Sequence, residues 1–456
     1  MGCGFRRASV APVKTETLTG WGLTPLVKTK VASPREDEAQ SHVRAAPHVI
    51  ARGLGRAYGD SAVCADGVTL LSSSFDSISQ IVDGRIIVGA GVSLDALLKV
   101  IVPQGWFVPV TPGTRFVTVG GAIAADIHGK NHHHDGSFGE HVDWIEMVLA
   151  DGTTVRSSPS ERSELFWATV GGMGLTGVVT RASIRLISIS TSRINVLTTR
   201  HRDLDQLMAA MIERDKTHRY TVAWVDTLAS GTRFGRSVLM AGEHAPVETL
   251  ARRSRNAPLE YDPRVRVGVP QSMSIKLVDN LTIRPFNEVW YRKSPRKSKS
   301  STETISKFFY PLDGVRDWNR LYGRVGFVQY QFVVPDDQAV MVREFIELMS
   351  TKRIPAFLSV LKRFGAGSLG WMSFPMRGWT LAVDIPADTE NLGSYLDSFD
   401  ERVAGVGGRV YLAKDSRMRA SVLRMMYPKI DEFRELRDKL DSRGIFVSHQ
   451  SRRLGL

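Results

Sequence analysis

A glycine-rich stretch at residues 109–139, PVTPGTRFVTVGGAIAADIHGKNHHHDGSFG, constrains the fold more than any other part of the sequence. Glycine tolerates positive φ and has no Cβ, so such a stretch lets backbone N–H groups approach a bound anion closely. Glycine content alone more often means surface turns. Here, however, a Gly-Gly pair, an alanine run and the triplet His128-Gly129-Lys130 fall within one short span. We therefore expect this stretch to form a wall against a polyphosphate or a flat cofactor.

The length and charge of the chain narrow the range of folds and partners. A chain of 456 residues is long enough for two or three domains with large cores. The formal net charge of +13 suits an anionic partner such as a phosphorylated substrate, an acidic lipid surface or nucleic acid. Because no nucleic-acid-binding module is recognisable, charge alone supports nucleic acid weakly, and we predict no such partner.

The sequence shows no targeting segment and no membrane span. The N-terminus, MGCGFRRASVAPVKTE, lacks the apolar core of a secretory signal. Arg6 stands where the myristoylation pattern requires Ser or Thr. No apolar run reaches the ~18 residues that a membrane span needs. The two cysteines, Cys3 and Cys64, give no disulfide framework and no CxxC pair. These features favour the cytoplasm and a frayed basic tail.

Short elements surround the glycine-rich stretch. Before it, we expect strands at 68–71 and 85–88 and a small helix that begins after Ser93 and ends at Pro103. After it, a strand at 145–150 runs into an Asp-Gly turn.

A second glycine motif, GMGLTG at residues 172–177, matches G-x-G-x-x-G literally. The dinucleotide fingerprint requires a strand before the motif and a helix after it. Here residues 164–169 favour a helix, and the following VVTRASIRL favours a strand. The context is inverted, so we reject a Rossmann site.

From about residue 190 the character of the sequence changes. Apolar residues recur at helical spacing in 204–214 and 340–349, and a long irregular region, 252–300, lies between them. That region ends in the basic run RKSPRKSK at 292–299, which is either a solvated loop or a contact for phosphate or lipid headgroups. The last segment returns to short elements, with a strand at 409–412 and two helices around Pro428.

Three strands of the middle region suggest a sheet with one polar face. In GFVQYQFVV, period two places Gln329 and Gln331 on one face and an almost wholly apolar set on the other. In WTLAVDI, Thr380, Ala382 and Asp384 share a face, and Lys362 ends the strand FLSVLK. Each strand alone is typical of a half-solvated sheet. Together they predict a sheet that is apolar behind and polar in front, as in a substrate domain.

Several common chemistries lack their motifs. His132, His133 and His134 beside Asp135 raise the possibility of a metal, but consecutive side chains diverge and rarely converge on one ion, so we predict no metal site. The sequence has no G-x-S-x-G, H-E-x-x-H or GxxxxGK[ST] motif, which removes the usual support for a serine hydrolase, a zincin or a P-loop NTPase. What remains is an enzyme whose cofactor performs the redox step.

Six segments resemble a known family: GLGRAYGD, PGTRFVTVGGAIAADIHGKNHH, ELFWATVGGMGLTG, WYRKS, FVQYQFVVP and YLAKDSRM. The chain resembles the FAD enzymes of the vanillyl-alcohol-oxidase type (PCMH-type FAD-binding) and, within them, the decaprenylphosphoryl-β-D-ribose 2′-oxidase family. The similarity runs from Leu18 to the C-terminus.

This resemblance implies an α+β fold in which a two-part FAD-binding domain of the vanillyl-alcohol-oxidase type receives an inserted antiparallel-sheet substrate domain. The implied FAD-binding parts are residues 1–190 and 409–456, and the implied substrate-binding domain is 191–408. Members with covalently linked flavin use a His in the first glycine turn. Because Arg56 and Ala57 occupy that area here, we expect FAD to be held non-covalently.

The resemblance also implies residues for the cofactor. The two glycine turns hold the FAD diphosphate, His128 and Gly129 line the flavin, Val179 contacts it and Tyr411 lies against it. The full set implied to bind FAD is Arg52, Gly53, Leu54, Gly55, Arg56, Ala57, Tyr58, Gly59, Asp60, Gly113, Thr118, Val119, Gly120, Gly121, Ala122, Ala125, Ile127, His128, Gly129, Val179 and Tyr411.

The implied reaction oxidises the ribose 2′-hydroxyl of a polyprenylphosphoryl-β-D-ribose to a ketone. Hydride passes from C2′ to flavin N5 while a base accepts the hydroxyl proton. A separate NAD(P)H-dependent short-chain reductase then completes epimerisation to the arabinose donor for cell-wall arabinan synthesis. Such enzymes are peripheral to the membrane, and the family has been placed in the periplasm.

By the same resemblance Lys414 and His128 are the catalytic residues, with Lys414 acting either as the base or as a stabiliser of the reduced, anionic flavin. Amides suit sugar hydroxyls, and lysines suit a phosphodiester as point charges. The residues implied to bind the substrate are Tyr58, Lys130, Gln329, Gln331, Lys362, Thr380 and Ala382.

Three positions depart from the family pattern. Ala382 replaces a cysteine beside the flavin, Thr380 replaces Asn, and Phe309 replaces Tyr. These departures change the polarity of the pocket, so the identity of the sugar and of the lipid stays open. One alternative is a soluble aldonolactone or sugar-alcohol oxidase of the same fold. Another is a basic binding protein that has kept the fold and lost the chemistry.

Overall fold

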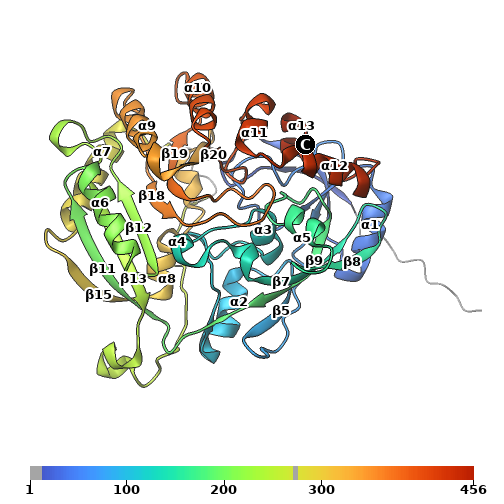
Figure 1. Cartoon of the computed structure of the whole chain (residues 1–456), viewed down its shortest axis with the longest axis horizontal. Coiled ribbons are helices and arrows are strands. Elements are labelled where there is room, and N and C mark those ends of the chain that lie inside the picture. Colours follow the sequence, from blue (N-terminus) through green and yellow to red (C-terminus); the bar gives the residue numbers. More distant parts are fainter. Residues whose placement is uncertain (1–12, 266, 271–275) are drawn as a thin grey trace, which may run out of the picture.

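Two four-stranded sheets and one eight-stranded sheet organise the part of the chain that the computed structural model describes, residues 13–265, 267–270 and 276–456. The predicted basic tail, with Arg6 and Cys3, lies outside these residues. Figure 1 shows the eight-stranded sheet on one side of the molecule and the two smaller sheets on the other.

The first small sheet has the order β1-β2-β4-β3, with β1 antiparallel to β2 and the other pairs parallel. The second, β5-β9-β7-β8, is antiparallel throughout. Their strands are β1 (Lys14–Leu18), β2 (Val27–Ala32), β3 (Val49–Arg52), β4 (Val68–Leu71), β5 (Arg85–Gly89), β7 (Val142–Val148), β8 (Thr154–Ser157) and β9 (Val178–Arg185). A separate two-stranded pair consists of β6 (Trp106–Phe107) and β10 (Ile187–Ser188).

Short helices pack on these sheets and bury one apolar side each. The predicted small helix is α2 (Leu94–Ile101), whose N-terminus is capped by the Ser93 hydroxyl and whose Leu94, Leu97 and Leu98 are fully buried. The glycine-rich stretch forms α3 (Val119–Ala124) and the one-turn α4 (His132–Asp135). The remaining helices of this half are α1 (Ala39–Ala45) and α5 (Ser163–Thr169).

The second glycine motif lies between α5 and β9, which confirms the inverted order of helix and strand. Gly174 and Gly177 have φ of +79° and +156°, values that favour glycine, so the motif works as a turn.

The eight-stranded sheet is antiparallel at every pairing, in the order β15-β11-β13-β12-β18-β19-β17-β20. Its strands are β11 (Arg193–His201), β12 (Tyr220–Val225), β13 (Ser237–His244), β15 (Lys299–Thr304), β17 (Phe327–Val334), β18 (Ser359–Phe364), β19 (Gly378–Pro386) and β20 (Arg409–Val410). A two-stranded parallel pair, β14 (Val267–Gly268) with β16 (Val315–Arg316), lies outside it.

Helices cover the apolar face of this sheet, as the period-two pattern predicted. Tyr330 and Phe332 of β17 pack on Phe345 of α9 (Val340–Thr351) and Phe399 of α10 (Leu392–Gly405), with ring centroids 5.2–6.2 Å apart. The helix α6 (Leu204–Asp215) contacts β12 and β13 on this face. The short helix α8 (Ile305–Phe309) packs on Tyr220 and Gly242, on the opposite face of the sheet.

The C-terminal segment returns to the N-terminal strands. It forms α11 (Ala420–Met426) and α12 (Ile430–Leu440), the two helices predicted around Pro428, and a third helix, α13 (His449–Leu454). The backbone of Val49 in β3 accepts from Val447 and donates to Ile445. The Arg453 guanidinium pairs with the carboxylates of Asp60 and Asp415, each at 2.9 Å.

Two sequence expectations for the middle region are wrong. Residues 252–300 are not irregular throughout, because α7 (Asn280–Lys293) lies within them, with its N-terminus capped by Asp279. Lys362 does not end its strand, since β18 continues to Phe364 and pairs Lys362 with Thr380 of β19.

Within the described ranges, no helix is both long enough and apolar enough to cross a membrane.

Candidate active site

Polar side chains of β17 and β19 lie together on the face of the eight-stranded sheet opposite to α9 and α10. The strand register places Gln329 opposite Asp384 and Gln331 opposite Ala382. The Gln329 amide donates to the Asp384 carboxylate, and the Gln331 amide donates to the Thr380 hydroxyl at 3.2 Å. Both glutamines are nearly fully buried. The alternation predicted from the sequence therefore gathers these groups on one wall.

His128, from the glycine-rich stretch, lies against this wall. Its Nε2 is 3.0 Å from the Gln331 amide nitrogen, and its ring packs edge-on to Phe364 with centroids 4.7 Å apart. Tyr411 packs on the other side at 5.3 Å. Burial, reinforced by nearby lysines, lowers the pKa of His128 well below its usual value, so the imidazole is neutral. Its Nδ1 is buried without a hydrogen-bond partner.

Three lysines from different segments lie near the polar wall and His128, and we call these residues together the recess. Lys130 belongs to the glycine-rich stretch, Lys362 belongs to β18, and Lys414 follows β20. The ammonium group of each lysine is surrounded by protein, and another part of each side chain is accessible to solvent. Among the described residues, no carboxylate lies within 4 Å of any of the three.

Burial is the main cause of the altered lysine pKa values. It lowers the pKa of Lys362 to about 8 and, together with the charge of Lys362, that of Lys130 to about 7. Lys130 Nζ donates to the Phe309 carbonyl at 3.0 Å. Lys130 and Lys362 have no carboxylate within 4 Å among the described residues, so they make the recess electropositive and suited to an anion.

Lys414 and Asp384 are oppositely charged groups of the recess that affect each other's pKa. Burial lowers the pKa of Lys414 while the Asp384 carboxylate opposes the shift, and burial raises the pKa of Asp384. The Lys414 ammonium lies 3.7 Å from the centroid of the Tyr58 ring. Asp384 was visible in the sequence as the third member of the polar face of β19, yet it was not among the predicted site residues.

The GLGRAYGD turn lies against the N-terminus of α3. A Cβ on Gly53 would lie 2.2 Å from the Thr118 hydroxyl, which caps α3 by accepting from Gly121 N–H. Gly55 has φ +65°, and a Cβ on Gly59 would lie 2.0 Å from the Asp415 carbonyl. Only glycine permits these approaches. The two glycine turns that the sequence singled out are thus brought together.

The charged residues of this turn are fixed by other segments. Arg52 donates to the carbonyls of Thr19 at 2.7 Å and Ala62 at 3.3 Å. The Arg56 guanidinium stacks on Trp21 at 3.8 Å from the ring centroid, and its Nε is buried without a partner.

The other residues of the predicted cofactor set fall into three groups. Ile127, Val179, Val119 and Ala122 belong to the apolar core behind the turns, and Ala125 accepts a hydrogen bond from Tyr411 at 2.8 Å. Gly129 approaches the Thr111 carbonyl, Gly120 approaches Ala90, and the Ala57 carbonyl accepts from Trp21 N–H. Leu54 is 46% exposed. Gly113 has open space on its Cβ side, and a Cβ on Gly121 would meet only the Thr118 hydroxyl.

Asp126 is a buried residue of this region that sequence analysis missed. Its carboxylate is fully buried and accepts from the hydroxyls of Ser137, Ser368 and Ser373 at 2.5–2.9 Å and from Gly139 N–H at 2.9 Å. The serines at 368 and 373 are more than 240 residues away along the chain, so no local signal reveals them. Asp126 fixes the glycine-rich stretch to the loop that follows β18.

The three consecutive histidines point to different partners, as their spacing predicted. His132 Nδ1 accepts from Gly365 N–H at 3.2 Å, and His133 Nε2 lies 3.0 Å from the His218 carbonyl. His134 pairs with Asp135 at 3.2 Å. Within the described ranges, no three His, Cys, Asp or Glu side chains are grouped so that they could hold a metal ion.

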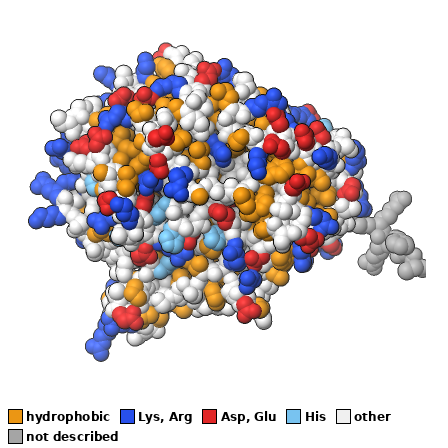
Figure 2. Space-filling model, viewed as in Figure 1, with side chains coloured by type: hydrophobic (Ala, Val, Ile, Leu, Met, Phe, Trp, Pro, Cys, Tyr) orange, Lys and Arg blue, Asp and Glu red, His pale blue; other side chains and the backbone are white. Residues whose placement is uncertain are grey.

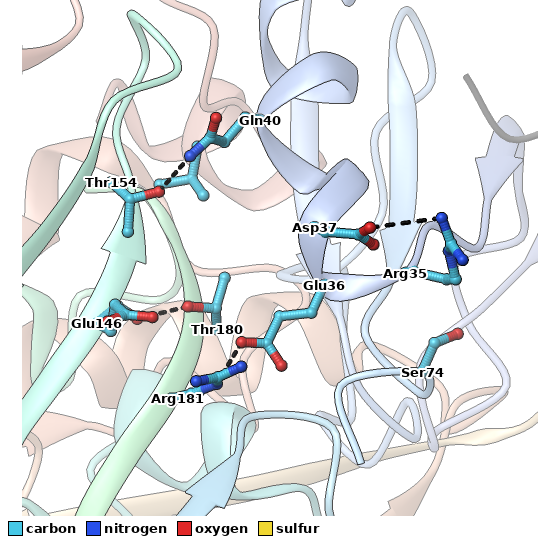
Figure 3. Close-up of a pocket in the computed structure, with 10 residues that line it drawn as sticks. Arg35, Glu36, Asp37, Gln40, Ser74, Glu146, Thr154, Thr180 and Arg181 are labelled. Carbon is cyan, nitrogen blue, oxygen red and sulfur yellow. Dashed lines mark hydrogen bonds and ion pairs between the residues drawn. The ribbon is translucent and has the colours of Figure 1, made fainter. Parts of the chain in front are cut away.

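A surface pocket between α1 and the strands β7–β9 includes none of the predicted site residues. Figure 3 shows its lining, in which Arg181 pairs with Glu36 and Gln40 donates to Thr154. Arg35 also pairs with Asp37 there, and the pocket is separate from the site described above.

Two family models match the chain. One described as "FAD binding domain" matches residues 31–158, and one described as "D-arabinono-1,4-lactone oxidase" matches residues 325–454. These ranges contain the glycine turns and the polar sheet wall respectively.

Curated relatives extend the match over the whole chain. Decaprenylphosphoryl-β-D-ribose oxidase of Mycolicibacterium smegmatis is 39% identical over 455 residues, which cover 98% of each chain. An uncharacterised protein from Streptomyces coelicolor, described by its place in the mprA 5′ region, is 40% identical over 80% of this chain and all of its own length. A Δ24-sterol reductase of Rattus norvegicus is 38% identical over 112 residues, 25% of this chain and 21% of its own.

The residues present fit FAD on two observations of the structure. Gly113 has nothing within 4 Å on its Cβ side and Gly121 has only the Thr118 hydroxyl, which leaves backbone open to a diphosphate. The buried His128 Nδ1 and Arg56 Nε have no hydrogen-bond partner among the described residues, and each is a polar atom that a bound ligand can satisfy. The turns at Gly53–Gly59 and Thr118–Gly121 would hold the diphosphate, and His128 and Tyr411 would lie beside the flavin.

Proposed function

The chain belongs to the decaprenylphosphoryl-β-D-ribose oxidase family and is an FAD-dependent oxidoreductase, and on that premise we propose that it oxidises the 2′-hydroxyl of a polyprenylphosphoryl-β-D-ribose to the 2′-ketone. Bound FAD supplies the acceptor for the hydride that leaves C2′. The side chains of this protein hold the sugar, attract the phosphodiester and receive the hydroxyl proton.

The observation that supports this substrate best is the pair of lysines, Lys130 and Lys362, that have no carboxylate within 4 Å among the described residues. Lys362 lies across from Thr380, which accepts from Gln331, and this amide can donate to and accept from sugar hydroxyls. A neutral free sugar would leave these charges unbalanced in the recess. A phosphodiester on the sugar balances them.

We propose Lys414 and His128 as the residues closest to the chemistry. Because its pKa is lowered, Lys414 can accept the hydroxyl proton when it is neutral. When it is protonated, it can stabilise negative charge that develops on the substrate oxygen or the flavin. The neutral His128 can donate or accept one hydrogen bond in the recess. Tyr58, beneath Lys414, fixes the position of its ammonium.

The three departures from the family pattern bear on the sugar side of the recess. Thr380 accepts from Gln331 and so helps to orient that amide. Ala382, across from Gln331, is 9% exposed and has no thiol, so a thiol-directed inhibitor has no cysteine to modify there. Phe309 offers its backbone carbonyl to Lys130, a contact that does not depend on a tyrosine hydroxyl.

Lys362→Met is expected to raise KM for a short-chain prenylphosphoryl ribose at pH 7 by about tenfold, because it removes one charge-assisted hydrogen bond to the phosphodiester. The wild-type KM is expected to rise between pH 7 and pH 9. Lys130 and Lys362 are protonated below their pKa values of about 7 and about 8 and lose their positive charge above them. The variant should show a weaker pH dependence. Steady-state kinetics at several pH values measure both effects.

Lys216→Met is the matched control, since Lys216 is an exposed lysine paired with Glu213 and should leave KM unchanged. The corresponding prenyl riboside without phosphate should show little effect of Lys362→Met. If the KM for the phosphorylated substrate is the same in the variant as in the wild type, Lys362 does not contact the phosphodiester.

The domain boundaries and the partners are part of the same proposal. We place the FAD-binding domain at residues 1–190 and 409–456 and the substrate-binding domain at 191–408. The contacts of Val49 and Asp60 with the C-terminal segment support this division, although β20 at the start of that segment pairs with the substrate-domain sheet. We further propose that the enzyme works at a membrane surface. A separate NAD(P)H-dependent reductase would then complete epimerisation to an arabinose donor for cell-wall arabinan.

A second candidate function, a soluble aldonolactone or sugar-alcohol oxidase, is favoured by the match of residues 325–454 to the lactone-oxidase family model. Turnover of free sugars or lactones with no gain from a phosphoprenyl group would support it.

A further inference from the structure

The helix α7 carries an apolar stripe on its solvent-facing side. Leu281, Pro285 and Val289 recur at a spacing of four, which places them on one face of the helix. Leu281 is 86% exposed and Val289 64% exposed, and Pro285 is exposed as well. Phe286 and Trp290, stacked with ring centroids 6.3 Å apart, flank the stripe. A solvent-facing helix surface is normally polar, so this stripe indicates contact with a partner.

The inner face of α7 is firmly attached to the rest of the protein. Asn287 donates to Asp226 at 2.7 Å, and Glu288 pairs with Arg236 at 2.5 Å. Ile283 is buried in an apolar cluster. The stripe is therefore not the inner side of a loosely held helix. It is presented to solvent by a helix with a separate, satisfied buried face.

Positive charge follows the apolar stripe directly. Lys293 ends α7, and Arg296 and Lys297 lie in the loop before β15. All three are exposed, and in the described part of the chain no carboxylate lies within 4 Å of their charged groups. Figure 1 shows α7 at the opposite end of the molecule from α1 and α12. On the face seen in Figure 2, Lys and Arg side chains project from the edge of that end.

We propose that α7 docks this protein on an anionic lipid bilayer. The docking face consists of Leu281, Pro285 and Val289, which enter the headgroup region, and of Lys293, Arg296 and Lys297, which pair with lipid phosphates. Apolar and basic residues side by side are the pattern of an interfacial helix. A second copy of the chain would set the same cations against each other, and nucleic acid would leave the apolar stripe in water. This inference rests on the proposed lipid-linked substrate.

Contacts between aromatic rings connect α7 to the recess. Phe286 packs on Phe357 at 5.4 Å, Phe357 on Trp318 at 6.3 Å, and Trp318 on Phe327 at 5.7 Å. Phe327 packs on Tyr58 at 5.5 Å, and Tyr58 lies beneath Lys414. Packed aromatic side chains therefore join the docking face to the candidate active site.

Vesicle co-sedimentation of the full-length, FAD-loaded protein tests the docking face. Wild type is expected to sediment with vesicles of phosphatidylglycerol and phosphatidylcholine in equal parts, and less with phosphatidylcholine alone. Leu281→Glu combined with Val289→Glu is expected to weaken binding to the anionic vesicles more than tenfold. Arg296→Gln combined with Lys297→Gln is expected to weaken it severalfold and to reduce its salt dependence.

The matched control is Val82→Glu combined with Val340→Glu, which adds the same charge at two exposed apolar positions elsewhere. It should bind vesicles as the wild type does. All variants should retain the flavin spectrum and the turnover of a short-chain, water-soluble substrate, because none of these residues lies in the recess.

The proposal is overturned if wild type does not bind anionic vesicles, or if the Leu281/Val289 variant binds them as well as wild type does. It is also overturned if the wild type forms dimers that this variant abolishes, since the face would then serve a second copy. If the wild type does not turn over the short-chain substrate, the proposed function is contradicted. Vesicle binding would still be decided by the sedimentation result alone.

Discussion

Replacing Lys414 with alanine is expected to lower kcat by about a thousandfold, the usual range for loss of a positioned acid–base or electrostatic group. Lys414 is the lysine of the recess that is coupled to Asp384 and that lies over Tyr58. Its removal leaves the Asp384 carboxylate without its nearest cation. FAD should remain bound, because the glycine turns and His128 are untouched. Stopped-flow measurement of flavin reduction, with the visible spectrum as the check on FAD content, tests this result.

Lys414→Arg separates the two roles open to this residue. Arginine keeps the positive charge but does not give up its proton in a protein. Substantial recovery of the rate in Lys414→Arg would mean that Lys414 stabilises charge, and no recovery would mean that it accepts the proton. Lys99→Ala, at an exposed lysine paired with Asp95, is the control and should be fully active. An active Lys414→Ala enzyme with FAD bound would remove Lys414 from the mechanism.

Replacing Asp126 with alanine is expected to lower the free energy of unfolding by about 4 kcal/mol, because it leaves several buried donors without an acceptor. The Asp126 carboxylate accepts from three serine hydroxyls and from Gly139 N–H with no exposure to solvent. Its φ of +38° adds strain for alanine, which tolerates this region less well than Asp does. Urea denaturation followed by tryptophan fluorescence measures the change.

Asp126→Asn keeps one acceptor oxygen and should cost about half as much. Asp337→Ala, at an exposed aspartate, is the control and should change stability by less than about 0.5 kcal/mol. If Asp126→Ala is as stable as the wild type, the serine hydroxyls find other acceptors. The link between the glycine-rich stretch and the loop after β18 would then not contribute to stability.

The features that were predicted correctly from the sequence are those that a local residue pattern determines. The alternation in residues 327–334 and 379–385 predicted the polar wall, because side chains of antiparallel strands alternate between faces whatever their partners are. The glycine motif at 172–177 matches the dinucleotide fingerprint, and a Rossmann site was excluded because a helix precedes the motif and a strand follows it.

Two kinds of feature could not be predicted from the sequence: contacts between residues far apart along the chain, and a helix whose apolar residues face solvent. The partners of Asp126 come from serines far along the chain. The helix α7 was missed because Pro285 lies inside it and because Leu281 and Val289 face solvent, which reverses the amphipathic signal. Lys362 was placed at a strand end because its charge resembled a terminus, whereas β18 continues to Phe364 beside the recess.

The most direct test of the central claim is the visible spectrum of the purified protein, recorded anaerobically before and after addition of a short-chain prenylphosphoryl ribose. We expect oxidised flavin bands that bleach with this substrate and stay unchanged with free ribose. Bands that stay oxidised with the phosphorylated substrate but bleach with a free lactone or sugar alcohol would contradict the proposed substrate and favour the alternative oxidase. A colourless protein that cannot be reconstituted with FAD would contradict the assignment as a flavoenzyme.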